Sequence, residues 1–290
     1  MSDATLTISD RIQSKLDDLT RAERQLAQSI LENYPASGLG PLATLAEEAH
    51  VSVPTVARMV QKLGFKGYPD FQAALREELK AKARSPIARY DTWAGSAPEE
   101  HMLNRFTDAV IDNIRHTLGQ IDPEGFDAAC ALVGDANRHL YIVGGRITHT
   151  LAEYLFLHMQ VIRPNLTHIQ STSNAWPHYL LDVQEGDVFV IYDVRRYENN
   201  TLKLAEMAHA KGAKLILFTD QWRSPVHPLA DICLSARIMV PSAWDSAATT
   251  LLLTETMISA VQTLNWERTK GRMEQLEEMF DRTRLFRKFT

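Results

Sequence analysis

Two adjacent arginines stand at the end of an apolar run in the segment IYDVRRYENN, residues 191–200. A guanidinium group offers a planar fork of donors that can hold a carboxylate or a phosphate through two parallel hydrogen bonds. Arg195 and Arg196 therefore predict a clamp for a small anion. The neighbouring Tyr197 either stacks on a ring of that ligand or fills the wall of its site.

An internal role for the two arginines is the alternative. Asp193, Glu198 and Glu153 carry the opposite charge, and an arginine paired with one of them would only hold the loop. Because adjacent side chains tend to point in different directions, we do not expect both guanidinium groups to be used internally. At least one of them is expected to meet a ligand.

A second turn with binding potential is VGGRITHT, residues 143–150. Gly144 and Gly145 let the backbone turn tightly, and the N-terminus of a helix that follows such a turn attracts an anion. Arg146 lies in the same turn and is included among the candidate ligand-binding residues. A tight turn that binds nothing would also explain the two glycines.

A third group of polar residues belongs to LATLAEEAHVSVPTVARMVQKLG, residues 42–64, which has the spacing of a helix-turn-helix. Ser52 is a good N-cap for the second helix, and Pro54 falls in the first turn, where a missing amide hydrogen costs nothing. The inner faces of the two helices are expected to consist of Leu42, Leu45, Ala46, Ala49, Val53, Val56, Val60 and Leu63.

The outward face of the second helix suits the major groove of double-stranded DNA. Arg58 can hold a guanine edge and Gln61 an adenine edge, each pair contributing about 1–3 kcal/mol of discrimination. Lys62 and Lys66 are expected to meet phosphates. The predicted DNA-binding residues are Ser52, Pro54, Thr55, Arg58, Gln61, Lys62 and Lys66.

A helical bundle with a solvated polar face is the alternative to this DNA-binding reading. The chain as a whole has a formal net charge of −5, whereas residues 49–69 contain basic side chains and no acidic one. Because local charge matters more than the sum, this asymmetry favours contact with DNA.

The elements that position these residues form two different patterns. Residues 1–84 show short amphipathic helices, and residues 85–99 collect Ser, Pro and Gly without periodicity, as in a linker. From residue 100 to 290, short apolar runs alternate with helical stretches, which predicts a parallel sheet covered on both faces. We therefore expect an all-α domain followed by a three-layer α/β/α domain, with ligands bound at the carboxyl ends of its strands.

Composition excludes several classes of protein. The chain has 290 residues, of which 45% are hydrophobic and 23% charged, as in an ordinary globular protein. Its two cysteines exclude a disulfide scaffold, and no spacing of His, Asp or Glu predicts a metal site or a cofactor. No apolar run approaches the roughly 18 residues of a membrane span, so we expect a cytoplasmic protein.

The N-terminal region resembles a known family. LTRAERQLAQSILENYP and LATLAEEAHVSVPTVARMVQKLGFKGYPDFQAALREEL are similar to the N-terminal domain of the RpiR family of bacterial transcriptional regulators. The S-x-x-T-V-x-R and G-F-K-G-Y-x-D-F elements carry the resemblance, which covers most of residues 1–85. It implies a DNA-binding regulator whose C-terminal sugar isomerase (SIS) domain senses a small molecule, often a phosphosugar.

The C-terminal half resembles a SIS domain in layout but departs from it in one loop. The resemblance places Gly144 and Gly145 in the sugar-phosphate loop, and Thr148 where a phosphate-binding serine is usual. The second loop of the family is a serine-rich S-x-S-G-x-T, and its positions correspond here to Asp193, Arg195, Arg196 and Glu198. Because carboxylates repel phosphate, the family's phosphate contacts are not transferred to Asp193 or Glu198.

These observations together predict a transcriptional regulator and not an enzyme. It would be a homodimer or homotetramer that binds double-stranded operator DNA and a small anionic effector, either a sugar phosphate or a carboxylate. One alternative is a sugar-phosphate isomerase, with a general base among Asp193, Glu198 and Asp245. The other alternative is a regulator whose sensing pocket is vestigial.

Overall fold

A computed structural model of the chain describes residues 6–32, 34–83, 86, 87, 90, 101–170 and 175–286. The predicted linker, residues 85–99, lies almost entirely outside this range, so the domain boundaries at 84 and 99 remain predictions. The chain divides into two compact units. The first contains residues 1–120, 221–223 and 237–246, and the second contains residues 121–220, 224–236 and 247–290.

The first unit begins with short helices packed around one apolar core. They are α1 (Ile8–Ser14), η2 (Leu16–Asp18), α2 (Arg21–Glu32), α3 (Leu42–Glu48), α4 (Val53–Lys62) and α5 (Tyr68–Ala83). The core includes Leu26, Leu45, Val60 and Phe71, all buried. The Thr7 side chain accepts from the Asp10 amide and the Asp10 carboxylate from the Thr7 amide, which satisfies two amides at the start of α1. The predicted helical domain is confirmed.

A longer helix, α7 (Met102–Leu118), also belongs to the first unit. His101 caps it by accepting a hydrogen bond from the Leu103 amide at 3.2 Å. Asn113 and Thr117, one turn apart on its buried side, bond the backbone of Met239 and Arg237. The helix expected just after residue 100 is therefore present and tied to residues 237–246.

The second unit contains a five-stranded sheet in the order β2-β1-β3-β4-β5, and every strand pairs in parallel. The strands are β1 (Leu140–Gly144), β2 (Leu166–Ile169), β3 (Val188–Tyr192), β4 (Lys214–Asp220) and β5 (Ile232–Ala236). Each coincides with an apolar run that the sequence predicts as a strand. β1 and β3 are buried along their whole length, because helices cover both faces.

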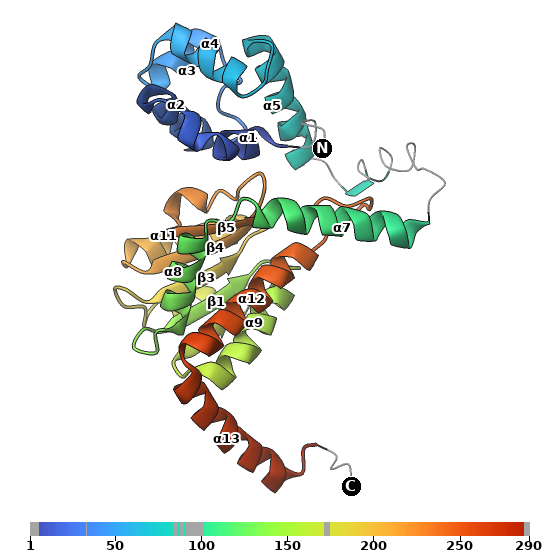
Figure 1. The fold of residues 1–290 in the computed structure, drawn as a ribbon. Helices are drawn as coiled ribbons and strands as arrows, with labels where there is room; N and C mark the ends of the chain where they lie inside the picture. The colour runs from blue at the N-terminus through green and yellow to red at the C-terminus, as the bar shows by residue number, and fades with distance from the viewer. Residues whose placement is uncertain are drawn as a thin grey trace. The chain divides into compact units, whose positions relative to one another are not determined.

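Helices cover the two faces of this sheet as separate layers (Figure 1). One face packs against α8 (Pro123–Gly134), α9 (His149–Ile162) and α12 (Ala248–Leu264). The other face packs against α11 (Asn199–Ala210). The short helices α10 (Trp176–Tyr179) and η3 (His227–Leu229) also contribute apolar side chains to the core on this face. Alternate residues of each strand serve the two cores, as the pleat of a strand requires. The predicted three-layer α/β/α fold is confirmed.

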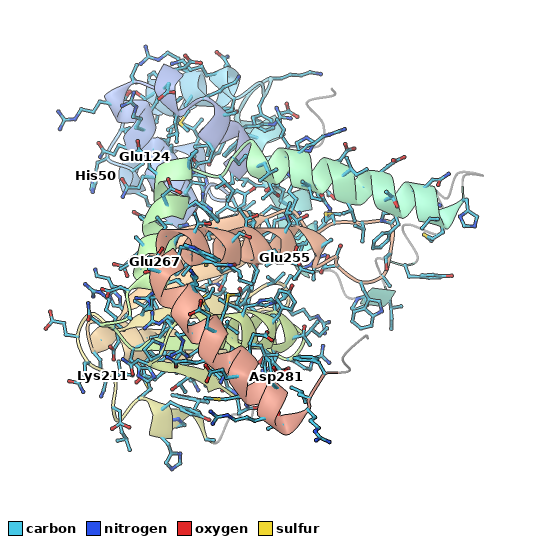
Figure 2. The ribbon with its side chains drawn as sticks, turned by 60° about the horizontal axis from the view of Figure 1, so that its bottom comes forward. His50, Glu124, Lys211, Glu255, Glu267 and Asp281 are labelled. Atoms are coloured by element: carbon cyan, nitrogen blue, oxygen red, sulfur yellow. The ribbon has the colours of Figure 1, made fainter. Side chains whose placement is uncertain are left out.

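The last helix, α13 (Trp266–Thr283), is fixed to the second unit by two arginines. Arg268 donates to the Gly134 carbonyl at 2.7 Å, and Arg272 donates to the Gln160 carbonyl at 2.6 Å. These carbonyls belong to the last turns of α8 and α9, where a cation is favoured by the helix dipole. Figure 2 shows Glu267 where α13 begins and Asp281 towards its far end. No helix among the described residues has the length and apolar run needed to cross a membrane.

The topology brings the two predicted ligand loops to one edge of the sheet. β1 and β3 are neighbours, and Gly144 pairs with Tyr192 at their carboxyl ends. The chain leaves β1 towards β2 on one side and leaves β3 towards β4 on the other. Such a reversal of strand order opens the crevice in which parallel sheets bind ligands.

Gly144 permits the close contact between β1 and α9. A Cβ atom at this position would lie 2.5 Å from the Thr148 carbonyl oxygen and 2.7 Å from the His149 amide nitrogen. We expect Gly144→Ala to lower the free energy of unfolding by about 1–3 kcal/mol, because the backbone must move. Gly271→Ala in α13, where nothing lies within 4 Å of the added atom, should be neutral or stabilising. Urea unfolding of both variants measures this, and equal stabilities would contradict the account.

Candidate functional site

The helix-turn-helix is built as the sequence predicts. The turn between α3 and α4 has His50 at a φ of 50°, and the Val51 amide donates to the Ala46 carbonyl at 2.9 Å. Ser52 is the N-cap residue of α4, and Pro54 lies in its first turn. The inner faces are formed by Leu45, Ala46, Ala49, Val56, Val60 and Leu63, which are all buried.

Three side chains of α4 differ from the prediction. Val53 is 45% exposed and not part of the core. Thr55 is only 8% exposed, because its hydroxyl turns back to the Ser52 hydroxyl at 2.8 Å, so it does not belong to the outward face. Lys62 donates to Glu23 at 2.7 Å and to the Asp18 carbonyl at 3.0 Å, which fixes α4 to the segment before it.

The exposed row of α4 is therefore narrower than predicted. Pro54, Arg58 and Gln61 are exposed and spaced four and three residues apart, so all three lie on one side of the helix. Ser52 and Lys62 are exposed as well, and Thr55 is the predicted residue that is buried. Lys66 is exposed just beyond the C-terminus of α4. Burial tends to raise the pKa of Glu23, but the bonds from Lys62 and Thr20 outweigh it and lower that pKa. Lys62 thus forms an ion pair with the Glu23 carboxylate of its own domain.

At the other site, the turn between β1 and α9 is closed by Thr148. Its hydroxyl donates to the Tyr192 carbonyl at 2.8 Å and accepts from the Gly145 amide at 2.8 Å. Thr148 consequently joins the ends of β1 and β3. The hydroxyl that the sequence assigns to an effector holds the turn itself together.

Glu198 lies against the turn that leads from β1 into α9. Its Oε1 accepts a hydrogen bond from the Arg146 amide at 2.7 Å. A Cβ atom added at Gly145 would lie 2.9 Å from the same oxygen, so glycine is what lets the carboxylate approach the turn. The amides of His149, Thr150 and Leu151 at the start of α9 already donate to backbone carbonyls of the preceding turn. The Arg146 amide in that turn is bonded by a carboxylate that the chain itself supplies.

Asp220, at the end of β4, organises the arginine loop. It is fully buried, and it accepts from the Arg195 amide at 2.8 Å and from the Tyr197 hydroxyl at 2.7 Å. Burial, followed by the negative charge of Asp220, raises the pKa of Tyr197 well above its usual value. Tyr197 therefore belongs to the wall of the site, one of its two predicted roles. Asp220 is not among the site residues that the sequence predicts. The signal was present, because Asp220 ends the apolar run KLILFTD just as Asp193 follows the apolar run VFVIY.

The two arginines of the loop differ in exposure: Arg195 is half-buried and Arg196 is exposed. Their predicted alternative partners have other contacts, since Ser224 donates to the Asp193 carboxylate and the Arg146 amide donates to Glu198. Arg146 is exposed as well. Two guanidinium groups, Arg146 and Arg196, thus reach solvent from the loops that end β1 and β3.

Asp193 is an unusual acid because it is 2% exposed. Burial raises the pKa of its carboxyl to about 7, against the opposing effect of the Ser224 hydrogen bond. The backbone around it is fixed by the Thr219 hydroxyl, which donates to the Asp193 carbonyl at 2.8 Å. In the described part of the chain, no group of three His, Cys, Asp or Glu side chains is placed to hold a metal ion.

Comparison with known families gives the two halves of the chain their identity. The model of the helix-turn-helix domain of the rpiR family matches residues 6–82, and that of the SIS domain matches residues 135–260. The chain belongs to the RpiR family. Both the helix-turn-helix and the SIS domain that the sequence predicts are confirmed.

Individual proteins agree with this assignment. The transcriptional regulator HexR of Pseudomonas aeruginosa is 28% identical over 232 residues, which cover 78% of this chain and 77% of HexR. The sugar isomerase domain of an RpiR transcription factor from Sphaerobacter thermophilus has a TM-score of 0.58 at 20% identity, over 62% of this chain and 99% of that domain. Vibrio vulnificus NanR complexed with ManNAc-6P has a TM-score of 0.56 at 18% identity, over 96% of this chain and 99% of NanR.

Of these relatives, HexR is named as a transcriptional regulator, and this RpiR protein shares its combination of a helix-turn-helix with a SIS domain. The named relatives thus favour a regulator over the isomerase alternative. The structure also explains the departure of its second loop from the serine-rich pattern. Where that pattern has hydroxyls, Asp193 binds Ser224 within the fold, and Glu198 bonds the Arg146 amide in the turn before α9.

The buried Asp193 predicts a pH dependence. Its pKa of about 7 in the fold exceeds the value near 4 of an unfolded chain, so the folded state holds the proton more tightly. The stability from this difference is complete below pH 4 and is lost as pH rises towards 7. We expect Asp193→Asn to gain stability relative to the wild type between pH 5 and pH 8. Urea unfolding at both pH values measures the change, and a constant difference would contradict the buried, protonated acid.

Proposed function

We propose that this protein is a cytoplasmic, DNA-binding transcriptional regulator. Its SIS domain would sense a small anionic metabolite, a sugar phosphate or a carboxylate, and thereby control operator binding. The observation that carries the proposal is the pairing, in one chain, of an exposed Arg58–Gln61 row with a strand-end turn that holds a negative charge. The name of HexR and the ManNAc-6P bound by NanR support it.

The DNA-binding half of the proposal rests on α4. Arg58 and Gln61 are exposed, and α4 itself is anchored through Val56, Met59 and Val60, none more than 1% exposed. A helix held in this way can present the two side chains to base edges in the major groove. We infer a homodimer or homotetramer, because paired heads would read an operator with two-fold symmetry.

The sensing half rests on the loops that end β1 and β3. Exposed Arg146 and Arg196 provide two guanidinium groups at this edge of the sheet, and the turn before α9 provides the Arg146 amide. Glu198 already bonds that amide. An effector anion would therefore have to displace the Glu198 carboxylate, which makes Glu198 an internal competitor. The alternative is a vestigial pocket, which binds no anion even when the Glu198 carboxylate is removed.

Replacement of Arg58 tests the DNA contact. We expect Arg58→Ala to weaken operator binding by about 1–3 kcal/mol and to relax the base preference, because a bidentate contact is lost. Arg76→Ala is the matched control, since Arg76 is an exposed arginine on α5. Fluorescence anisotropy with operator DNA selected from a random pool measures both variants. Operator affinity unchanged by Arg58→Ala would remove α4 from the DNA interface.

Replacement of Glu198 tests the sensing site. Glu198→Gln keeps the shape of the side chain and removes its charge, so we expect phosphate and hexose 6-phosphates to bind about tenfold more tightly. Glu206→Gln, an exposed position on α11, is the matched control. Isothermal titration calorimetry measures the affinities. If no phosphate, phosphosugar or sugar acid binds either the wild type or Glu198→Gln, the site is vestigial.

A further inference from the structure

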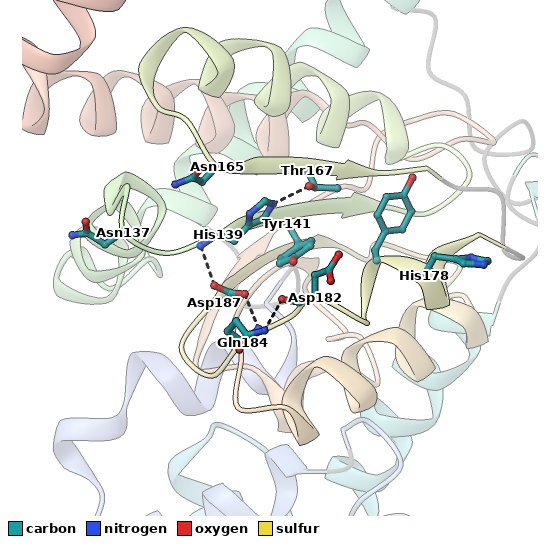
Figure 3. Close-up of a pocket in the computed structure, with 10 residues that line it drawn as sticks. Asn137, His139, Tyr141, Asn165, Thr167, His178, Asp182, Gln184 and Asp187 are labelled. Atoms are coloured by element: carbon teal, nitrogen blue, oxygen red, sulfur yellow. Dashed lines mark hydrogen bonds between the residues drawn. The ribbon is translucent and has the colours of Figure 1, made fainter.

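A second pocket lies at the opposite edge of the sheet, beside the amino ends of the strands (Figure 3). Its volume is about 420 Å³, within the range of small-molecule sites. It is lined by His139 and Tyr141 at the start of β1 and by Thr167 of β2. Tyr179 at the end of α10, and Asp182 and Asp187 between α10 and β3, complete the part of the lining that matters here. None of these residues takes part in the effector turn.

Tyr141 is the most informative of these residues. It is 3% exposed, and its ring stacks on Phe189 at 4.6 Å and lies tilted against His139 at 4.5 Å between centroids. Its hydroxyl makes no hydrogen bond to any described residue, whereas His139, Thr167 and Asp187 are paired. The hydroxyl oxygen is not one of the fully buried polar atoms that lack a partner, so it faces the open volume of the pocket while the ring is buried. The Tyr141 hydroxyl is therefore poised for a partner that enters the pocket.

The charge of the pocket defines that partner. Asp182 and Asp187 line it, and the described residues of its lining include no lysine or arginine. The Asp187 oxygens accept from the His139 amide at 2.9 Å and the Gln184 amide at 2.8 Å (Figure 3). The Asp182 carboxylate has no hydrogen bond among the described residues and is exposed at the mouth. One carboxylate thus remains available, close to Tyr141.

Neighbouring groups keep the pocket negative. Burial lowers the pKa of His139, so its imidazole is neutral near pH 7 and offers no cation. The Nε2 atom of His139 lies 2.8 Å from the Thr167 hydroxyl, so this ring nitrogen already has a hydrogen-bond partner. Burial, together with the charges of Asp187 and Asp182, raises the pKa of Tyr141 to about 12, so the hydroxyl keeps its proton. With an unbonded carboxylate on Asp182 and neutral His139 and Tyr141 beside it, the pocket favours a cation over an anion.

We propose that this pocket binds a small organic cation. An ammonium group would donate to the Asp182 carboxylate and to the oxygen of the Tyr141 hydroxyl. The apolar or aromatic body of the ligand would lie against Tyr179, whose ring face also attracts a cation. The ligand is thus opposite in charge to the effector proposed for the α9 turn. The two sites occupy opposite edges of one sheet.

Three probes of similar shape and different charge test the proposal on the full chain. They are 2-phenylethylamine, 2-phenylethanol and phenylacetate, which are cationic, neutral and anionic at pH 7. We expect the amine to bind in isothermal titration calorimetry and to raise the melting temperature, the alcohol to bind at least about tenfold more weakly, and phenylacetate not to bind. Equal binding of all three, preference for phenylacetate, or no binding of the amine would overturn the proposal.

Two variants locate the binding. Asp182→Asn should weaken amine binding about tenfold, because a charge-assisted hydrogen bond is lost. Tyr141→Phe keeps the stacked ring and removes only the hydroxyl, and should weaken binding by about threefold or more. Glu185→Gln, an exposed neighbour outside the lining, should change nothing. Amine binding that is unaffected by both Asp182→Asn and Tyr141→Phe would place the cation elsewhere and overturn the assignment.

Discussion

The hydrogen bond from the Arg146 amide to Glu198 is the contact on which the account of this protein depends. It places a negative charge that belongs to the chain at the turn between β1 and α9. The contact exists because Gly145 has no side chain and because the Thr148 hydroxyl draws the ends of β1 and β3 together. A site that carries its own anion can respond to an external anion only by exchange. The affinity for an external anion would then depend on its competition with Glu198 as well as on its direct contacts.

The two edges of the sheet differ in charge for reasons of construction. At the carboxyl edge, Arg146 in the turn after β1 and Arg196 in the loop after β3 are exposed, and the carboxylates of Asp193 and Glu198 are buried or already bonded. At the amino edge, Asp182 and Asp187 surround a pocket without a cation, and the Tyr141 hydroxyl has no described partner. The two proposed sites would thus give one layered domain separate places for ligands of opposite charge.

Much of the fold could be predicted from the sequence because it depends on local periodicity. All five strands coincide with apolar runs, and the helix-turn-helix follows from its spacing and from Pro54 in the first turn of α4. The contacts of individual polar side chains could not be predicted. Thr55 and Lys62 fall on the outward side of a helical wheel, yet each finds a partner in its own domain. The roles of Asp220 and Tyr141 depend on contacts with residues distant in sequence, namely Arg195 and Tyr197 for Asp220 and Phe189 for Tyr141.

The central claim is that an anion at the α9 turn controls DNA binding. The most direct test is the operator affinity of the full chain, measured by fluorescence anisotropy during titration with sugar phosphates and sugar acids. The account predicts that at least one of these anions changes the affinity about tenfold, and that Glu198→Gln shifts the response to lower anion concentration. An operator affinity that no anion changes, in either the wild type or Glu198→Gln, would contradict it.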